Sequence, residues 1–171
     1  EQGWLLTGAA GERLGQFDWV ISTSPAPQAD KLLPACFAYK AALSEVDFFP
    51  CLSLLLGFRS APELNFDAAV VRNSPLSWIA ANSSKHGRPA SFALTVHSDN
   101  QWARTQPKGS IDTVRNSMLA ALNELLGDQL PAPEHIAIHR WEYAKAETNL
   151  EKDFLLDESN RLAACGDWCA G

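Results

Sequence analysis

The chain has 171 residues, of which 46% are apolar and 20% charged, and its formal net charge is −6. This length and composition are typical of one globular domain, or of one domain with parts of a neighbour. The acidic balance and the lack of a basic cluster argue against nucleic acid or an anionic membrane as the main partner. The longest strongly apolar run, residues 51–58, is too short to span a bilayer, and no signal peptide is visible.

The first half of the chain alternates short apolar runs with turn residues. A Gly-rich polar turn around residues 8–11 separates the first two runs, and Pro25 and Pro27 end the second. Pro50 indicates a further boundary. The expected elements are strands at 3–7 and 18–23, a short helix at 28–33, a helix within 35–46, and strands at 51–59 and 66–72.

The second half contains the clearest helix of the chain, at residues 110–126. Apolar residues recur there at helical spacing, Ser110 is a good N-cap, and Gly127 suits the position after the helix. Strands are expected at 91–97 and 134–141. A polar stretch, 142–160, then leads to a last strand at 162–164.

These elements predict an α+β fold with a mixed, mostly antiparallel sheet and flanking helices. Residues 1–30 and 161–171 carry strand-then-turn units typical of a nucleotide-binding sheet, whereas 31–160 has the character of a separate domain. We therefore expect 31–160 to be inserted between two terminal parts of such a sheet. The last strand ends in a Gly-Asp turn, where we expect a truncated helix to begin.

The four cysteines are not spaced like the disulfide framework of a small secreted domain, which favours a reduced, cytoplasmic protein. Cys165 and Cys169 are four residues apart, but no histidine is near them, and Cys36 and Cys51 are widely spaced. We therefore predict no metal site.

Four segments together point to a known family: VISTSPAPQ (20–28), NSPLSW (73–78), HRWEYA (139–144) and CGDWC (165–169). In this order they resemble the bacterial renalase-like proteins, FAD-dependent oxidoreductases often described as flavin-containing amine oxidases. The resemblance extends along essentially the whole chain. It implies that 31–160 is a substrate-binding domain and that 1–30 and 161–171 are remnants of a Rossmann-like FAD-binding domain. Each motif alone is weak, and their succession is specific.

The resemblance implies that FAD is the cofactor and that five residues contact it: Thr23, Pro25, Gly166, Asp167 and Trp168. Gly lets the backbone approach a ligand closely, and an Asp carboxylate accepts hydrogen bonds from sugar hydroxyls. The alternative for the first two is a plain proline turn. For Gly166 and Asp167 it is an ordinary turn with Asp as a helix cap.

The resemblance also implies a flat slot for the reacting ring, with Trp141 as its wall and His97 as its polar partner. We assign these two as the catalytic positions, and Trp78 and Arg140 as substrate-binding. The alternatives are core packing for the tryptophans, a rim histidine, and a salt bridge for Arg140.

The activity implied is oxidation of misreduced dihydro-NAD(P) isomers by hydride transfer to flavin, with dioxygen as electron acceptor. A flavin-dependent amine oxidase is the first alternative. The second is a non-catalytic fragment or interaction domain without FAD, because Gly8, Gly11 and Gly15 do not match the Gly-x-Gly-x-x-Gly fingerprint that holds a pyrophosphate. On that basis we expect the isolated chain to be inactive.

Overall fold

The computed structural model describes residues 3–88, 91–127 and 130–170. The chain forms two compact units, each described here by itself: unit 1 holds residues 1–48 and 145–171, and unit 2 holds residues 49–144. The predicted domain boundaries after residues 30 and 160 both fall inside unit 1. The reason is that the helices after residue 25 and the strands after residue 154 share one hydrophobic core.

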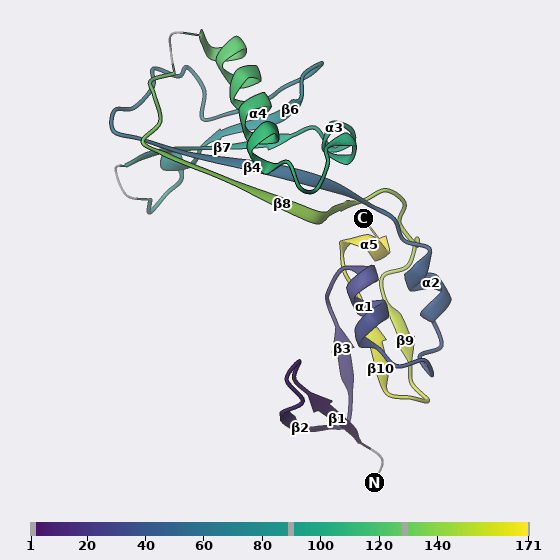
Figure 1. Ribbon diagram of the computed structural model, residues 1–171. Helices are drawn as coiled ribbons and strands as arrows, with labels where there is room; N and C mark the ends of the chain where they lie inside the picture. The colour runs from purple at the N-terminus through teal and green to yellow at the C-terminus, as the bar shows by residue number, and fades with distance from the viewer. Residues whose placement is uncertain (1–2, 89–90, 128–129, 171) are drawn as a thin grey trace. The chain divides into compact units, whose positions relative to one another are not determined.

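Unit 1 combines a hairpin, a three-stranded sheet and three short helices (Figure 1). The sheet has the strand order β3-β10-β9, in which β10 is parallel to β3 and antiparallel to β9. The elements are β1 (Trp4–Thr7), β2 (Arg13–Phe17), β3 (Val20–Ser22), α1 (Ala26–Leu32), α2 (Lys40–Ser44), β9 (Leu155–Asp157), β10 (Leu162–Ala164) and α5 (Asp167–Ala170).

One face of this sheet packs against the helices of unit 1. Leu155, Leu162 and Ala164 are buried there together with residues of α1 and α2 and the ring of Trp168. The side chains of successive strand residues alternate between faces, so Ile21 of β3 points to the other face and is 62% exposed. The sheet is therefore covered on one side within unit 1.

The helix expected within residues 35–46 is much shorter than predicted, because α2 covers only Lys40–Ser44. The backbone of residues 36–38 instead forms hydrogen bonds with the end of β9 and the turn that follows it. Asp157 accepts a hydrogen bond from the Ala38 amide, and the Asn160 side chain donates to the Cys36 carbonyl. A tertiary contact thus takes the hydrogen-bonding groups that a longer helix would have used.

Unit 2 is built on a five-stranded sheet with the order β5-β6-β7-β4-β8. The paired stretches with a defined register are antiparallel. The α+β class with mostly antiparallel pairing is confirmed. The elements are β4 (Phe48–Phe58), β5 (Ala68–Val70), β6 (Leu76–Ala81), the 3-10 turn η1 (Asn82–Ser84), β7 (Phe92–Ser98), α3 (Asn100–Thr105), α4 (Ile111–Leu126) and β8 (His135–Ala146).

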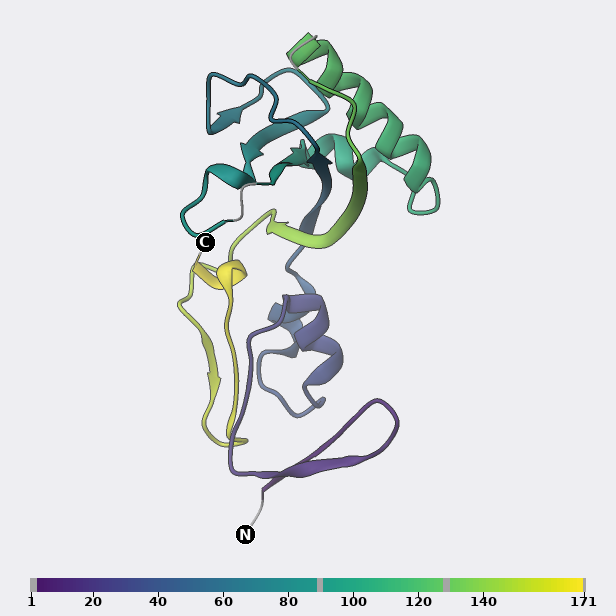
Figure 2. The same cartoon turned by 90° about the vertical axis from the view of Figure 1, so that its left-hand side faces the viewer.

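The core of unit 2 lies between the sheet and α3 and α4, which both lie on the same side of it (Figures 1 and 2). The predicted helix at 110–126 is confirmed as α4, and its Val114, Met118 and Leu122 are buried. They meet the even-numbered positions of β4, including Leu54, which has no exposed surface. Burying such a side chain contributes about 1.5–3 kcal/mol.

Several elements differ from the sequence-based expectation. The strands β2, β6 and β9 and the helix α3 were not predicted, and β8 continues five residues past Trp141. The Pro50 boundary is wrong, because β4 runs from Phe48 through Pro50. Pairing of β4 with β7 begins at Ser53, so Pro50 needs no amide hydrogen on that side.

Candidate functional site

The carboxyl ends of the parallel strands β3 and β10 lie side by side in unit 1. Ser22 is in register with Ala164, and the Cys165 amide donates to the Ser22 carbonyl at 3.0 Å. The next residue on β3, Thr23, is exposed. This edge, beyond the carboxyl ends of parallel strands, is where open α/β sheets bind their ligands.

Trp168 ties the two strand ends together. Its indole nitrogen donates to the carbonyl of Ser24 at 3.1 Å, and the ring is only 1% exposed. Gly166 makes this contact possible, because a Cβ at that position would lie 2.4 Å from the indole nitrogen. The predicted contact of the Trp168 ring with a cofactor therefore has no support. The ring is part of the core, and its role is to hold the two turns.

The remaining predicted cofactor residues lie close by. Asp167 is exposed and is the first residue of α5, next to the strand end. Pro25 precedes α1, and its carbonyl accepts from the amides of Gln28 and Ala29, so it starts the helix. The structure thus brings Thr23, Gly166 and Asp167 to one edge. Their predicted contact with FAD stays a prediction.

Two serines at this edge were not predicted from the sequence. The hydroxyls of Ser22 and Ser24 are hydrogen-bonded to each other at 2.9 Å, and Ser24 also supplies the carbonyl for Trp168. The run of polar residues after the short apolar strand β3 was the available signal. Both serines shape the turn that presents Thr23.

In unit 2, three predicted site residues share the sheet face opposite the helices. His97 of β7 is directly opposite Ser53 of β4 and is in register with Trp78 of β6. Residues opposite each other in an antiparallel pair point to the same face. The indole nitrogen of Trp141 on β8 donates to the Ser53 hydroxyl at 3.1 Å, which places it in this row. We call Trp78, His97, Ser53 and Trp141 the cross-strand row.

This face is partly open within unit 2. Trp141 is 56% exposed and Trp78 is 37% exposed, whereas Ser53 is buried. The ring of His139 meets that of Trp141 edge-on, with centroids 4.3 Å apart. The row therefore offers flat aromatic surface with a few polar groups, which is the general make-up of a small-molecule site. Ser53 was not predicted, because nothing in the sequence marks it among the apolar residues of β4.

Two titratable groups of this face have shifted pKa values. Burial lowers the pKa of His97, and the nearby positive charge of Lys85 lowers it further. Its imidazole is therefore neutral at pH 7. Burial raises the pKa of the Cys51 thiol, although hydrogen bonds with Ser98 and Ser53 oppose the shift. Cys51 is accordingly a neutral thiol rather than a thiolate nucleophile.

Arg140 does not belong to the cross-strand row. Arg140 directly precedes Trp141 on β8, so the two side chains point to opposite faces of the sheet. The guanidinium of Arg140 donates to the Ala103 carbonyl of α3 on the helix-covered face. It also pairs with Glu142 at 2.8 Å. Lys108 and Arg140 together lower the pKa of the Glu142 carboxyl. The geometry thus supports the salt-bridge alternative for Arg140 rather than substrate binding.

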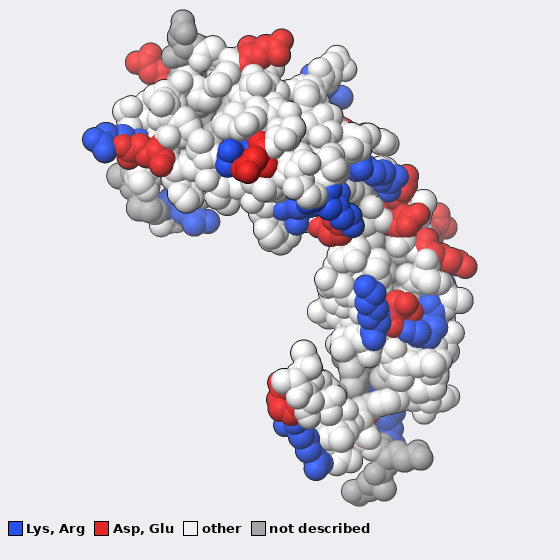
Figure 3. Space-filling model, viewed as in Figure 1, with Lys and Arg blue, Asp and Glu red and all other residues white. Residues whose placement is uncertain are grey.

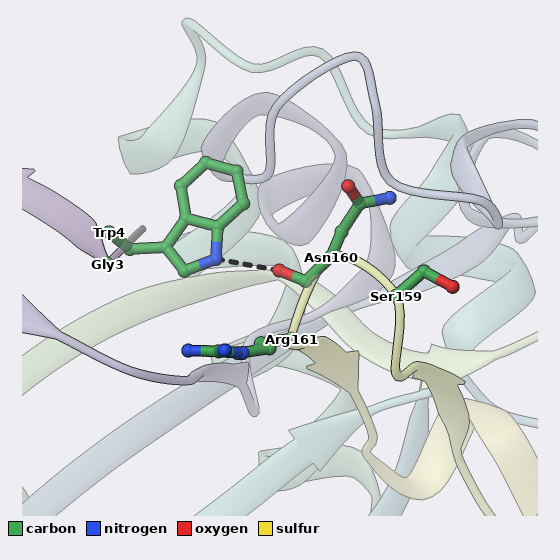
Figure 4. Close-up of a pocket in the computed structure, with 5 residues that line it drawn as sticks. All are labelled: Gly3, Trp4, Ser159, Asn160 and Arg161. Carbon is green, nitrogen blue, oxygen red and sulfur yellow. Dashed lines mark hydrogen bonds between the residues drawn. The ribbon is translucent and has the colours of Figure 1, made fainter. Parts of the chain in front are cut away.

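A pocket of about 310 Å³ lies elsewhere in unit 1, between the β1–β2 hairpin and the turn that precedes β10. Figure 4 shows Trp4 donating to the Asn160 carbonyl beside Arg161, with a donor–acceptor distance of 2.8 Å. Because this turn precedes β10, the pocket is at the opposite end of that strand from Asp167. It is therefore not the predicted cofactor edge.

Charged side chains do not gather into a patch of one sign on the face shown in Figure 3, where basic and acidic groups stand next to each other. Ion pairs such as Lys108 with Glu142 at 2.6 Å account for part of this pattern. Within the described ranges, no three His, Cys, Asp or Glu side chains are placed to hold a metal ion. No helix among the described residues is long and apolar enough to cross a membrane.

Several solved structures have a similar fold. A proposed protoporphyrinogen oxidase from Exiguobacterium sp. 255-15 matches with a TM-score of 0.62 over 99% of this chain, at 16% identity. An oxidoreductase from Methanosarcina mazei matches at 0.58 over 96%, with 13% identity. A putrescine oxidase bound to putrescine matches at 0.55 over 72%, with 13% identity. The chain covers 40%, 43% and 28% of these structures, respectively.

The fold is therefore shared with part of each of these longer proteins. The chain belongs to the flavin-containing amine oxidoreductase family, whose model matches residues 2–170. The family predicted from the four motifs is confirmed at this level.

Proposed function

We propose that the protein acts as a renalase-like, FAD-dependent oxidoreductase that oxidises misreduced dihydro-NAD(P) isomers. The observation that carries this proposal is the cross-strand row, which presents two partly exposed indole rings and a neutral imidazole on one face. A dihydropyridine ring is flat and largely apolar, with one amide substituent. It matches a surface of aromatic rings with a single polar partner.

FAD fits the chemistry of the predicted cofactor edge. An exposed Thr hydroxyl and an exposed Asp carboxylate lie at neighbouring strand ends, at Thr23 and Asp167. Together they can donate to and accept from the hydroxyls of a polyol chain such as the one in FAD. When bound, the flavin accepts a hydride and passes the electrons to dioxygen, giving hydrogen peroxide.

The residues of unit 2 would bind and orient the substrate. Trp141 and Trp78 would offer their ring faces for stacking. His97, kept neutral by burial and by Lys85, would exchange a hydrogen bond with the carboxamide. No proton has to be removed from the substrate before a hydride leaves a dihydropyridine, so no general base is required from this face.

Amine oxidation is the second candidate, favoured by the family description and by the likeness to a putrescine oxidase. An amine must lose its charge and be held among aromatic rings before oxidation. The positive charge of Lys85 beside His97 disfavours a cationic amine at this face. Tyr39, one of two tyrosines, packs against Phe37 in the core of unit 1. These observations favour the dihydropyridine.

We further propose a cytoplasmic location, because all four cysteines are free thiols. We propose small-molecule partners because the family is one of amine oxidoreductases. Because the isolated chain is expected to be inactive, the function is tested in an intact, FAD-loaded enzyme that contains these residues. It is mixed anaerobically with the 2- and 6-dihydro isomers of NAD, and separately with putrescine. Loss of flavin absorbance with the isomers, followed by one equivalent of peroxide on aeration, is expected. Bleaching by putrescine alone would support the amine oxidase instead.

Variants locate this activity on the cross-strand row. We expect Trp141→Phe and His97→Asn to slow flavin reduction by about tenfold or more, because each removes a group that orients the ring. Trp19→Phe is the matched control, since Trp19 is 43% exposed and lies in unit 1. If the substrate reduces the flavin equally fast in the Trp141→Phe and Trp19→Phe variants, this face does not bind the substrate.

A further inference from the structure

We infer that Ser53 is a positioning residue that holds the Trp141 ring as a platform for a planar heteroaromatic ring. The inference rests on the proposed function for the identity of that ring. It adds a residue that neither the sequence motifs nor the family assignment indicates. The Ser53 hydroxyl fixes the orientation of the Trp141 indole before a ligand binds.

The first observation is the contrast in exposure between the two partners. Ser53 is only 4% exposed, on a strand flanked by β7 and β8, whereas Trp141 is 56% exposed. A tryptophan that exposed can give its N–H to water at little cost. It nevertheless donates to the Ser53 hydroxyl at 3.1 Å. The bond therefore orients the ring rather than satisfying a buried donor.

The second observation is that both partners are themselves restrained. Ser53 is itself fixed at a buried position of β4, where it is paired with His97 of β7. The imidazole of His139 meets the indole edge-on, with an interplanar angle of 68°. Trp141 is thus held at its N–H by one strand and at its ring by a neighbour on its own strand. One part of its surface stays open.

Holding the ring in advance matters for affinity. Ordering a free aromatic side chain on binding costs about 0.5–1.5 kcal/mol, and a platform that is already ordered avoids this cost. Ser53 is also directly opposite His97, so the platform and the polar partner are set by adjacent strands of one rigid sheet. Removing the hydroxyl would free Trp141 and leave the backbone pairing of β4 with β7 in place.

The test needs no flavin and uses the quenching of Trp141 fluorescence by nicotinamide, a neutral planar heteroaromatic ring. The Trp141 signal is obtained as the difference between the wild-type chain and Trp141→Phe. We expect Ser53→Ala to weaken binding of the probe by about three- to tenfold, the loss of one hydrogen bond. Ser53→Thr keeps the hydroxyl and should bind within about twofold of wild type.

Ser44→Ala is the matched control, because that exposed hydroxyl bonds only to a local helix carbonyl in unit 1. Circular dichroism confirms that each variant is folded, and His139→Gln tests the second restraint should Ser53→Ala fail to fold. The inference is overturned if Ser53→Ala binds like wild type, if Ser53→Thr is as weak as Ser53→Ala, or if wild-type Trp141 is not quenched. Quenching that depends on Ser53 without turnover of dihydro-NAD isomers would sink the proposed function alone.

Discussion

Replacing Gly166 by alanine should destabilise unit 1 through one defined collision. The new Cβ would lie 2.4 Å from the indole nitrogen of Trp168 and 2.7 Å from its Cδ1. The ring is 1% exposed and lies in a packed core, so it cannot move aside freely. The bond to the Ser24 carbonyl is lost, at about 1 kcal/mol, and overpacking adds about 1–3 kcal/mol. We expect the free energy of unfolding to fall by about 2–4 kcal/mol.

Urea unfolding followed by far-UV circular dichroism measures this loss. Gly109→Ala is the control, because a Cβ there meets nothing within 4 Å, and its effect should stay within about 0.5 kcal/mol. A double-mutant cycle isolates the cause. In a Trp168→Leu background no indole ring is present, so the added methyl should cost much less. An equal cost of Gly166→Ala in both backgrounds would refute the reasoning.

Two further outcomes are expected in unit 2. Leu54→Ala should lower the free energy of unfolding by about 2–5 kcal/mol, because Leu54 has no exposed surface. Leu55 is 40% exposed on the other face of the sheet, so Leu55→Ala should cost less than about 1 kcal/mol. Similar losses for the two variants would contradict the assignment of these residues to opposite faces. Lys108 and Arg140 lower the pKa of Glu142 in the folded protein. The ionised carboxylate therefore stabilises the fold above the usual pKa near 4.5, and this stabilisation is lost as the pH falls through the lowered pKa. Glu142→Gln should therefore lower the unfolding free energy at pH 7 by about 0.5–1 kcal/mol, discounted for exposure, and have no effect at pH 2, where a remaining difference would argue against the ion pairs.

The predicted cofactor edge and the face that carries the cross-strand row are independent of each other, because each depends on contacts within one unit. The edge depends on the parallel pairing of β3 with β10, which places Thr23 beside Cys165 and the Gly166 turn. The face depends on antiparallel register, which aligns His97 with Ser53. The fluorescence test bears only on the face, and the Gly166 cycle bears only on the turn.

The sequence by itself determined the elements whose signals are local. Helical spacing of apolar residues with Gly127 after them was enough for α4, and a short apolar run before Gly166 was enough for β10 and its turn. The motif order was enough for the family. Such signals are readable because periodicity and capping depend on neighbours a few residues apart.

Only the tertiary structure decided which side chains share a face of a sheet. It also decided which segments, such as residues 35–39, do not form the helix that their local sequence favours. Asp157 holds the Ala38 amide from 119 residues away, which no local pattern near residue 38 reveals. Trp141 and Arg140 are adjacent in sequence and point to opposite faces of the sheet. Ser53 meets Trp141 and His97 only because strands from distant parts of the chain are brought together. Long-range register sets these contacts, and register is a property of the assembled sheet.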